Sequence, residues 1–240
     1  MQSIYHIEGT KHFVHASNQV LLRNPNHFPN FQKKLEEFKN LVSNLVASNK
    51  SATFIHFGDG DYYFHREDPK GSARPGKRAL SVPYNKLDMN RFREGWLACD
   101  YHCIEYLEVG AIPKLIKLYP RVVPNTIPTE FLYGLTMNKW FFKTFAGKIG
   151  LIGSGNKLNV IKELMKHKVY QDYLGLENFN DYIRIPERFA CDNLDNTIEM
   201  VRKQLEQANP STCIYLYGVG HVKSGLIHEL PKIKNAVYLD

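Results

Sequence analysis

The run from Thr53 to Tyr63, Thr-Phe-Ile-His-Phe-Gly-Asp-Gly-Asp-Tyr-Tyr, constrains the fold of this chain more than any other stretch. Residues 52–57 are mostly apolar and rich in strand-forming side chains, and the Gly-Asp-Gly-Asp that follows does not readily continue a strand. A buried strand that ends in acidic residues places carboxylates at the carboxyl edge of a sheet, where open α/β folds bind ligands. The stretch therefore predicts a strand that leads directly into a ligand site.

Asp59 and Asp61 in this run suggest a metal site. In an extended backbone or a glycine turn, two residues at this spacing can direct their carboxylates at one ion. Hard carboxylate oxygens suit Mg²⁺ or Mn²⁺, and such an ion usually completes its shell with waters and substrate phosphates. Gly-Asp-Gly-Asp is also ordinary turn chemistry, so a plain surface turn is the alternative.

The composition is that of an ordinary soluble globular protein with an excess of positive charge. Of the 240 residues, 43% are hydrophobic and 23% are charged, and the formal net charge is +7. This charge favours anionic partners such as nucleotides, phosphosugars, nucleic acid or anionic membrane surfaces. Neither a signal peptide nor an apolar stretch long enough to span a membrane is apparent. The four cysteines form no metal-binding pattern, so we expect reduced core thiols, no membrane span and a cytoplasmic protein.

The chain up to residue 145 contains three stretches with helical periodicity of apolar residues. They cover residues 31–48, 87–109 and 129–145, and each is expected to be a helix. The helix over 87–109 would begin near Asp88 and would carry Cys99 and Cys103 one turn apart. The polar stretch 64–85 is broken by glycine and proline, so we expect it to be a loop.

The second half shows a regular alternation of strands and helices. Strands are expected at 148–152, 181–185, 212–217 and 235–240, and helices at 158–168, 192–208 and 222–230, with a further helical piece through Leu174. Such alternation predicts an α/β, Rossmann-like fold with a mostly parallel sheet and helices on both faces. We expect one domain over residues 1–240, with 1–50 as an N-terminal strand and helix extension and 51–240 as the core. Because the last predicted strand ends on Asp240, we expect this domain to come from a longer polypeptide.

Two glycine turns follow predicted strands and open predicted helices. They are Gly153-Ser154-Gly155-Asn156 and Gly218-Val219-Gly220-His221. Glycines let a backbone approach a phosphate, and the free N–H groups at the start of a helix favour an anion. Neither turn is a complete dinucleotide or Walker motif, and tight turns also need glycine for steric reasons. Two such turns near the Asp pair nevertheless favour a nucleotide site at the carboxyl edge.

Several basic side chains lie near this predicted site. Arg74, Lys77 and Arg78 belong to the polar stretch after the Asp pair, which is either a solvated loop or a lid over a pyrophosphate or an acceptor, with Tyr84 beside it. Arg188 follows another predicted strand and could contact a diphosphate or form a surface salt bridge.

The order of these elements resembles the GT-D-fold glycosyltransferases. That family begins its core with a strand that ends in Arg-Phe/Tyr-Gly-Asp-Gly-Glu, and the matching run here is residues 56–61, His-Phe-Gly-Asp-Gly-Asp. Less specific matches lie at 147–153, at Ile185-Pro186 with Ala190 and Asp195, and at 216–240. Two departures concern the site, since His56 stands where the family has arginine and Asp61 stands where it has glutamate.

The resemblance implies transfer of a sugar from a nucleoside diphosphate donor, with UDP as the expected nucleotide, to a glycan hydroxyl. Asp59 and Asp61 would hold Mn²⁺ or Mg²⁺ against the diphosphate. Candidate donor-binding residues are Gly58, Asp59, Gly153, Ser154, Gly155, Asn156, Arg188, Gly218, Gly220 and His221, and candidate acceptor or lid residues are Arg74, Lys77, Arg78 and Tyr84. An inverting enzyme also needs a base, for which Asp61, Asp192, Glu187 and His221 are candidates, although Asp192 is an equally good helix cap.

Two other functions remain open at this point. A methyltransferase that uses S-adenosylmethionine (SAM) also has a glycine turn after a strand, but it normally places that turn at the first strand, where this chain has its acidic pair. A non-enzymatic nucleic-acid-binding domain would agree with the positive charge, but it needs a basic stripe with interleaved aromatic residues. Only the 66–78 segment offers one, so we expect no nucleic-acid partner.

Overall fold

The computed structural model describes residues 31–240 except 75–76, 79, 105–116, 120–125 and 137–138. Its centre is a seven-stranded sheet in the order β5-β4-β1-β9-β8-β6-β7, and every neighbouring pair is parallel. The strands are β1 (Ala52–Phe57), β4 (Tyr101–Ile104), β5 (Thr126–Pro128), β6 (Ile149–Ser154), β7 (Asp181–Ile185), β8 (Ile214–Gly218) and β9 (Val237–Leu239). The predicted α/β, Rossmann-like fold is confirmed. The strand predicted within residues 1–30 lies outside the described residues.

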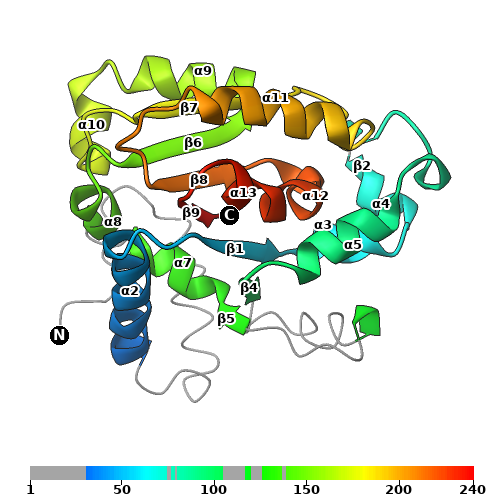
Figure 1. Ribbon diagram of the computed structural model, residues 1–240, viewed down its shortest axis with the longest axis horizontal. Helices are drawn as coiled ribbons and strands as arrows, with labels where there is room; N and C mark the ends of the chain where they lie inside the picture. The colour runs from blue at the N-terminus through cyan, green and yellow to red at the C-terminus, as the bar shows by residue number, and fades with distance from the viewer. Residues whose placement is uncertain (1–30, 75–76, 79, 105–116, 120–125, 137–138) are drawn as a thin grey trace.

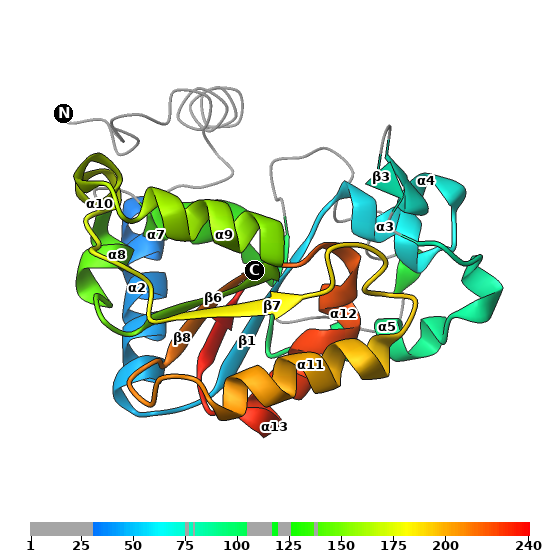
Figure 2. The same ribbon diagram turned by 90° about the horizontal axis from the view of Figure 1, so that it is seen from above.

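Helices cover both faces of the sheet (Figures 1 and 2). One face carries α2 (Phe31–Ala47), α7 (Thr129–Leu135), α8 (Trp140–Thr144), α9 (Gly155–Leu164) and α10 (Lys168–Leu174). The other carries α5 (Met89–Leu97), α11 (Leu194–Glu206), α12 (Lys223–Leu226) and α13 (Leu230–Ile233). Two buried apolar clusters fill the layers, and successive strand residues such as Phe54 and Ile55 belong to opposite clusters because their side chains alternate. With both faces covered, ligands reach the sheet at its ends.

The elements of the second half lie close to their predicted positions. Strand β7 has the predicted bounds, and α11 begins two residues later than expected because Asn193 caps it through a side-chain oxygen 3.0 Å from the Asn196 amide nitrogen. The helix predicted at 222–230 is divided into short pieces, which are η3 (Gly220–Val222), α12, η4 (Ile227–Glu229) and α13.

Two of the helices predicted before residue 146 differ from the structure. The helix predicted over 87–109 is wrong, because α5 ends at Leu97 and Cys103 lies in strand β4. A short buried apolar run cannot be assigned to a helix or a strand from periodicity alone. Here the run forms a strand because it pairs with β1. The helix predicted over 129–145 is two helices, α7 and α8, and Lys139 precedes α8 in the left-handed region with φ 61°.

The Gly-Asp-Gly-Asp run is part of a helix. Helix α3 (Asp59–His65) begins immediately after β1, with Gly58 as its N-cap. The stretch 64–85, predicted to be a loop, contains α4 (Pro69–Ser72), the antiparallel pair β2 (Ala73–Arg74) and β3 (Lys77–Arg78), and η1 (Tyr84–Lys86). The short β1–α3 connection therefore aims the first turn of α3, including Asp61, across the carboxyl ends of the strands.

Candidate functional site

Four charged or titratable side chains meet at the carboxyl ends of β1, β8 and β9. Lys223 Nζ lies 3.1 Å from Asp61 Oδ2 and 2.7 Å from Asp240 Oδ2, and His221 Nδ1 lies 3.4 Å from Asp61 Oδ1. Asp61 and Lys223 are each 5% exposed. The sheet order explains this meeting, because β9 pairs with both β1 and β8 and so brings the end of the chain next to the start of α3.

Asp61 is held as a carboxylate by its neighbours. Burial raises the pKa of Asp61. The charge of Lys223, the hydrogen bond from His221 and the Gly58 N–H together lower it by a larger amount, so the pKa lies well below its usual range. The Gly58 amide nitrogen lies 2.8 Å from Asp61 Oδ2, which is the return hydrogen bond of a capping box. The Asp61 carboxylate therefore both caps the start of α3 and belongs to the charge cluster.

Lys223 is the cation at the centre of this cluster. Burial lowers its pKa, but the carboxylates of Asp240 and Asp61 raise it by more, so the pKa lies above its usual range. Asp240 is itself anchored on β1, because its Oδ2 accepts from the His56 amide at 3.0 Å and its own amide donates to the Phe54 carbonyl at 3.1 Å. A buried carboxylate–lysine–carboxylate bridge therefore joins the ends of β1 and β9 to α12.

His221 has the surroundings of an oriented imidazole. Its ring stacks on Phe64 at a centroid distance of 4.6 Å and an interplanar angle of 10°, and its Nδ1 faces Asp61. A carboxylate at Nδ1 favours the tautomer in which Nδ1 carries the proton and Nε2 can accept one. This arrangement suits a general base, and a hydrogen bond of this length can shorten when substrate binds.

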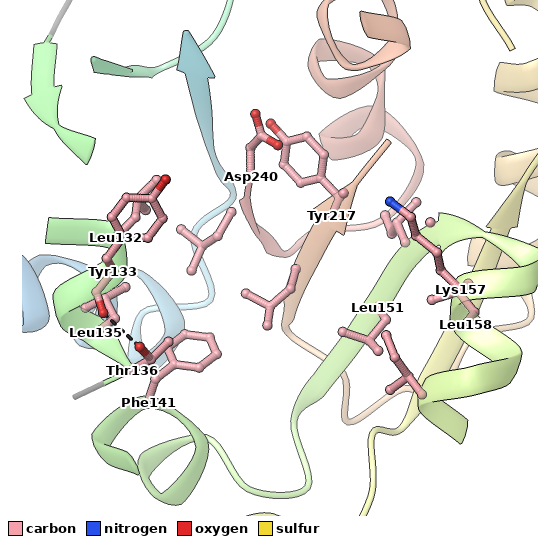
Figure 3. A pocket seen from close by; sticks show the side chains of 16 residues that line it. Leu132, Tyr133, Leu135, Thr136, Phe141, Leu151, Lys157, Leu158, Tyr217 and Asp240 are labelled. Atoms are coloured by element: carbon pink, nitrogen blue, oxygen red, sulfur yellow. Dashed lines mark hydrogen bonds between the residues drawn. The ribbon is translucent and has the colours of Figure 1, made fainter. Parts of the chain in front are cut away.

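A pocket of about 370 Å³ opens at the same edge of the sheet. Figure 3 shows Leu132, Leu135 and Phe141 on one side of it, Leu151 and Leu158 on another, and Asp240 beside Tyr217. The predicted donor residues Gly153 and Gly218 both line it. A side chain added at Gly218 would meet nothing within 4 Å, so a ligand can approach the backbone there.

The Mn²⁺ or Mg²⁺ ion implied by the resemblance fits Asp61 poorly. Its Oδ2 already accepts from Gly58 and Lys223, and the Lys223 ammonium supplies the positive charge that a metal would bring. Residues two apart in a helix, as positions 59 and 61 are, do not face each other as they would in a strand. In the part of the chain described, no three His, Cys, Asp or Glu side chains are grouped to hold a metal ion. The side chain of Asp59 lies outside this description, so metal binding through it stays a prediction.

The predicted phosphate site at the start of α9 already holds a protein anion. The Glu187 carboxylate accepts a hydrogen bond from the Asn156 amide, and its Oε1 lies 2.8 Å from where a side chain on Gly155 would begin. Ser154 is the N-cap and makes no side-chain capping hydrogen bond there. Glu187 thus takes the place that a phosphate was expected to fill, while Arg188 is exposed in the turn that follows β7.

The remaining predicted residues lie around this site rather than in it. Asp192 accepts hydrogen bonds from the amide and hydroxyl of Ser81, so it ties the segment after β3 to the start of α11. The Tyr84 hydroxyl donates to the Asp68 carbonyl at 3.1 Å. The predicted lid residues Arg74, Lys77 and Arg78 have backbones in the β2–β3 pair, and their side chains are outside the described set.

Two residues of the cluster escaped the sequence analysis. Asp240 is the last residue of the predicted strand 235–240, so its position at a strand end was a usable signal, as it was for Asp59 and Asp61. No signal in the sequence pointed to Lys223, because a lysine in a polar run such as Gly-His-Val-Lys-Ser is normally exposed to solvent. All four cysteines are free, as expected, and no described helix is long and apolar enough to cross a membrane.

Comparison with known proteins gives little further guidance. No family model and no curated protein matches the chain. Among solved structures, the chain is similar to a glycosyltransferase (DUF1792) from Streptococcus sanguinis at 14% identity, with 83% of this chain and 78% of that chain covered and a TM-score of 0.47. A likeness at this level identifies neither the family nor the activity of this chain.

Proposed function

We propose that this chain is a glycosyltransferase that moves a sugar from a nucleoside diphosphate donor, UDP in the first instance, to a hydroxyl acceptor. The observation that carries the proposal is the His221–Asp61 pair at the carboxyl edge of a parallel sheet, connected through Lys223 to Asp240, which lines an open pocket. Ligands of open α/β folds bind at this edge. The Gly-Asp-Gly-Asp run that resembles the glycosyltransferase motif supplies Asp61 to the pair.

In the proposed reaction His221 Nε2 takes the proton of the acceptor hydroxyl. The acceptor oxygen forms a bond to the anomeric carbon of the sugar, the bond between that carbon and the diphosphate oxygen breaks, and the electron pair leaves with the nucleoside diphosphate. Asp61 stabilises the imidazolium that forms, in the way that carboxylates orient catalytic histidines. The exposed backbone of Gly218 and Gly220 is proposed to lie against the donor diphosphate, since neither position would place a side chain within 4 Å of another atom.

We also propose roles for the β2–β3 pair and for Asp59 from their positions near α3. The β2–β3 pair, with Arg74, Lys77 and Arg78, follows α3 and α4 in the chain, and Figure 2 shows this segment beside α3. We assign it the part of a lid that brings positive charge to the leaving diphosphate. A divalent ion held by Asp59 would supply further charge neutralisation at the diphosphate.

The test is turnover of nucleoside diphosphate sugars, read as release of the nucleoside diphosphate and as mass of the glycosylated acceptor. His221→Ala is expected to lower kcat by about 10²–10⁴-fold, the usual contribution of a general base. The matched control is His167→Ala, since His167 is exposed before α10. Equal rates for the two variants would remove His221 from the reaction, and SAM-dependent methyl transfer with no sugar transfer would contradict the proposed function.

A further inference from the structure

The pocket at the carboxyl edge lies over β6, β8 and β9, between the described helices α7 and α9. Its floor is formed by Leu151 of β6, Leu216 of β8 and Leu239 of β9, and its walls come from α7 and α8 on one side and α9 on the other. Figure 3 shows the space between these walls, with Leu135 and Phe141 facing Leu151 and Leu158 across it. The site therefore combines a polar end at Asp240 with a largely apolar interior.

The polar atoms that this pocket offers are few. Tyr217 donates its hydroxyl to the Phe54 carbonyl at 3.0 Å, and the Thr136 hydroxyl donates to the Tyr133 carbonyl at 2.8 Å, so both have a partner within the protein. The Asp240 carboxylate lies at one end, and Lys157 is exposed on α9. A nucleobase carries several donors and acceptors in its plane, and each one left unpaired on burial weakens binding. The aliphatic walls therefore favour an apolar group over a base.

We propose that this pocket binds an apolar aglycone of the sugar acceptor, with the sugar head of that acceptor at the Asp240 end. The inference rests on the proposed glycosyl transfer for the role of the ligand, but the binding itself requires neither donor nor turnover. The volume of about 370 Å³ lies within the range of small-molecule sites. The acceptor hydroxyl then lies at the end of the pocket where Lys223 connects Asp240 to Asp61 and His221.

The donor is accommodated on the other side of Gly218 in this arrangement. Gly218 lines the pocket, and the chain continues through Gly220 to His221, which faces Asp61. A donor lying along 218–221 and an acceptor in the pocket would meet beside the imidazole. In the proposed arrangement the last residue of β8 lies between the two substrates.

The experiment is calorimetric titration of the full chain with methyl, butyl and hexyl glucosides, without any donor. Each buried methylene is expected to tighten binding by about fourfold, from about 0.8 kcal/mol per CH₂ and 1.4 kcal/mol per factor of ten. Thr136→Trp, at an exposed residue of the pocket wall, should remove this dependence on chain length. The control is Val160→Trp, since Val160 is 59% exposed on α9 and does not line the pocket.

The outcomes separate this inference from the proposed function. Affinity that rises with chain length in the wild type and in Val160→Trp, but not in Thr136→Trp, supports an aglycone site even if no sugar transfer is found. Affinity that does not depend on chain length overturns the inference, even if the enzyme releases nucleoside diphosphate. Loss of nucleoside diphosphate binding in Thr136→Trp would also overturn it, because the pocket would then hold the nucleoside.

Discussion

At the scale of single residues, Lys223 supplies the positive charge that allows the Asp61 and Asp240 carboxylates to stay charged at the site. Asp61 and Asp240 each contribute −1 and Lys223 contributes +1, so the cluster has a formal charge of −1 when His221 is neutral. Without the lysine, two carboxylates would remain in a largely dry environment with no cation between them. Buried ion pairs add little net stability when complete, but loss of one partner is costly.

Lys223→Met is therefore expected to lower the free energy of unfolding by roughly 3–5 kcal/mol, because it strands Asp61 and Asp240. The measurement is urea unfolding at pH 7 followed by far-UV circular dichroism. Lys232→Met is the matched control, since Lys232 pairs with Glu229 at 2.9 Å but its side chain is 62% exposed. A surface pair of this kind contributes at most about 1 kcal/mol. Equal losses in the two variants would refute a central role for Lys223.

His65 links stability to pH. It is 1% exposed, its Nδ1 pairs with the Tyr119 hydroxyl, and its Nε2 has no hydrogen-bond partner among the described residues. Burial lowers its pKa to about 4, opposed by the charge of Asp61 and reinforced by Arg93, His221 and Lys223. Near its usual value of about 6.5 the unfolded chain takes up a proton that the folded chain does not, so stability falls as the pH drops from there toward 4.

Between pH 7 and pH 5 this residue is expected to cost about 2 kcal/mol of folding free energy. Urea midpoints measured across this range for wild type and His65→Gln provide the check, since glutamine does not titrate. The variant should be less stable at pH 7 and should lose less on acidification. If both proteins lose the same amount, His65 is not buried as a neutral imidazole.

At the scale of elements, the sequence correctly predicted the helices and strands that have a clear periodicity of apolar residues and recognisable residues at their ends. Strands β6, β7 and β8 and helices α9 and α11 follow this rule, since each is bounded by glycine, proline or capping residues. Strand β4 was missed because four residues, three of them buried, are too few to show a periodicity, and its partner β1 lies 47 residues earlier at the Phe54–Tyr101 pair. The residues of the site can be grouped in the same way. Asp61, His221 and Gly218 were predicted from local motifs. The Lys223–Asp240 bridge was not, because it depends on β9 pairing with β1 across most of the chain.

The contact between α5 and α12 depends on a glycine. A Cβ added at Gly95 would lie 2.2 Å from the Ser224 carbonyl oxygen and 2.6 Å from His228 Nδ1. Gly95→Ala is expected to destabilise the protein by about 1–3 kcal/mol through overpacking, although alanine is the better helix former by about 1 kcal/mol. Gly218→Ala is the control, because its Cβ meets nothing within 4 Å. Thermal unfolding compares the two, and a gain in melting temperature for Gly95→Ala would contradict this packing.

At the scale of the whole molecule, the parallel sheet directs every strand toward one edge, and the features proposed for function lie along it. The Asp61–Lys223–Asp240 bridge lies at that edge, Gly218 and Asp240 line the apolar pocket, and His221 follows Gly218 in the chain and faces Asp61. Glu187 already satisfies the start of α9, so the 218–221 turn is the better place for a diphosphate. We therefore propose that the donor binds at the end of β8.

Calorimetric titration of UDP and GDP into wild type and Gly218→Leu, with Mn²⁺ and with a chelator, tests whether the donor binds at the 218–221 turn. Wild type is expected to bind one of the two nucleotides, and Gly218→Leu, which remains folded by circular dichroism, is expected to bind it at least about tenfold more weakly, a difference of about 1.4 kcal/mol. Equal affinity in both proteins would place the nucleotide elsewhere. Binding of SAM in the absence of binding by either nucleotide would contradict the glycosyltransferase proposal itself.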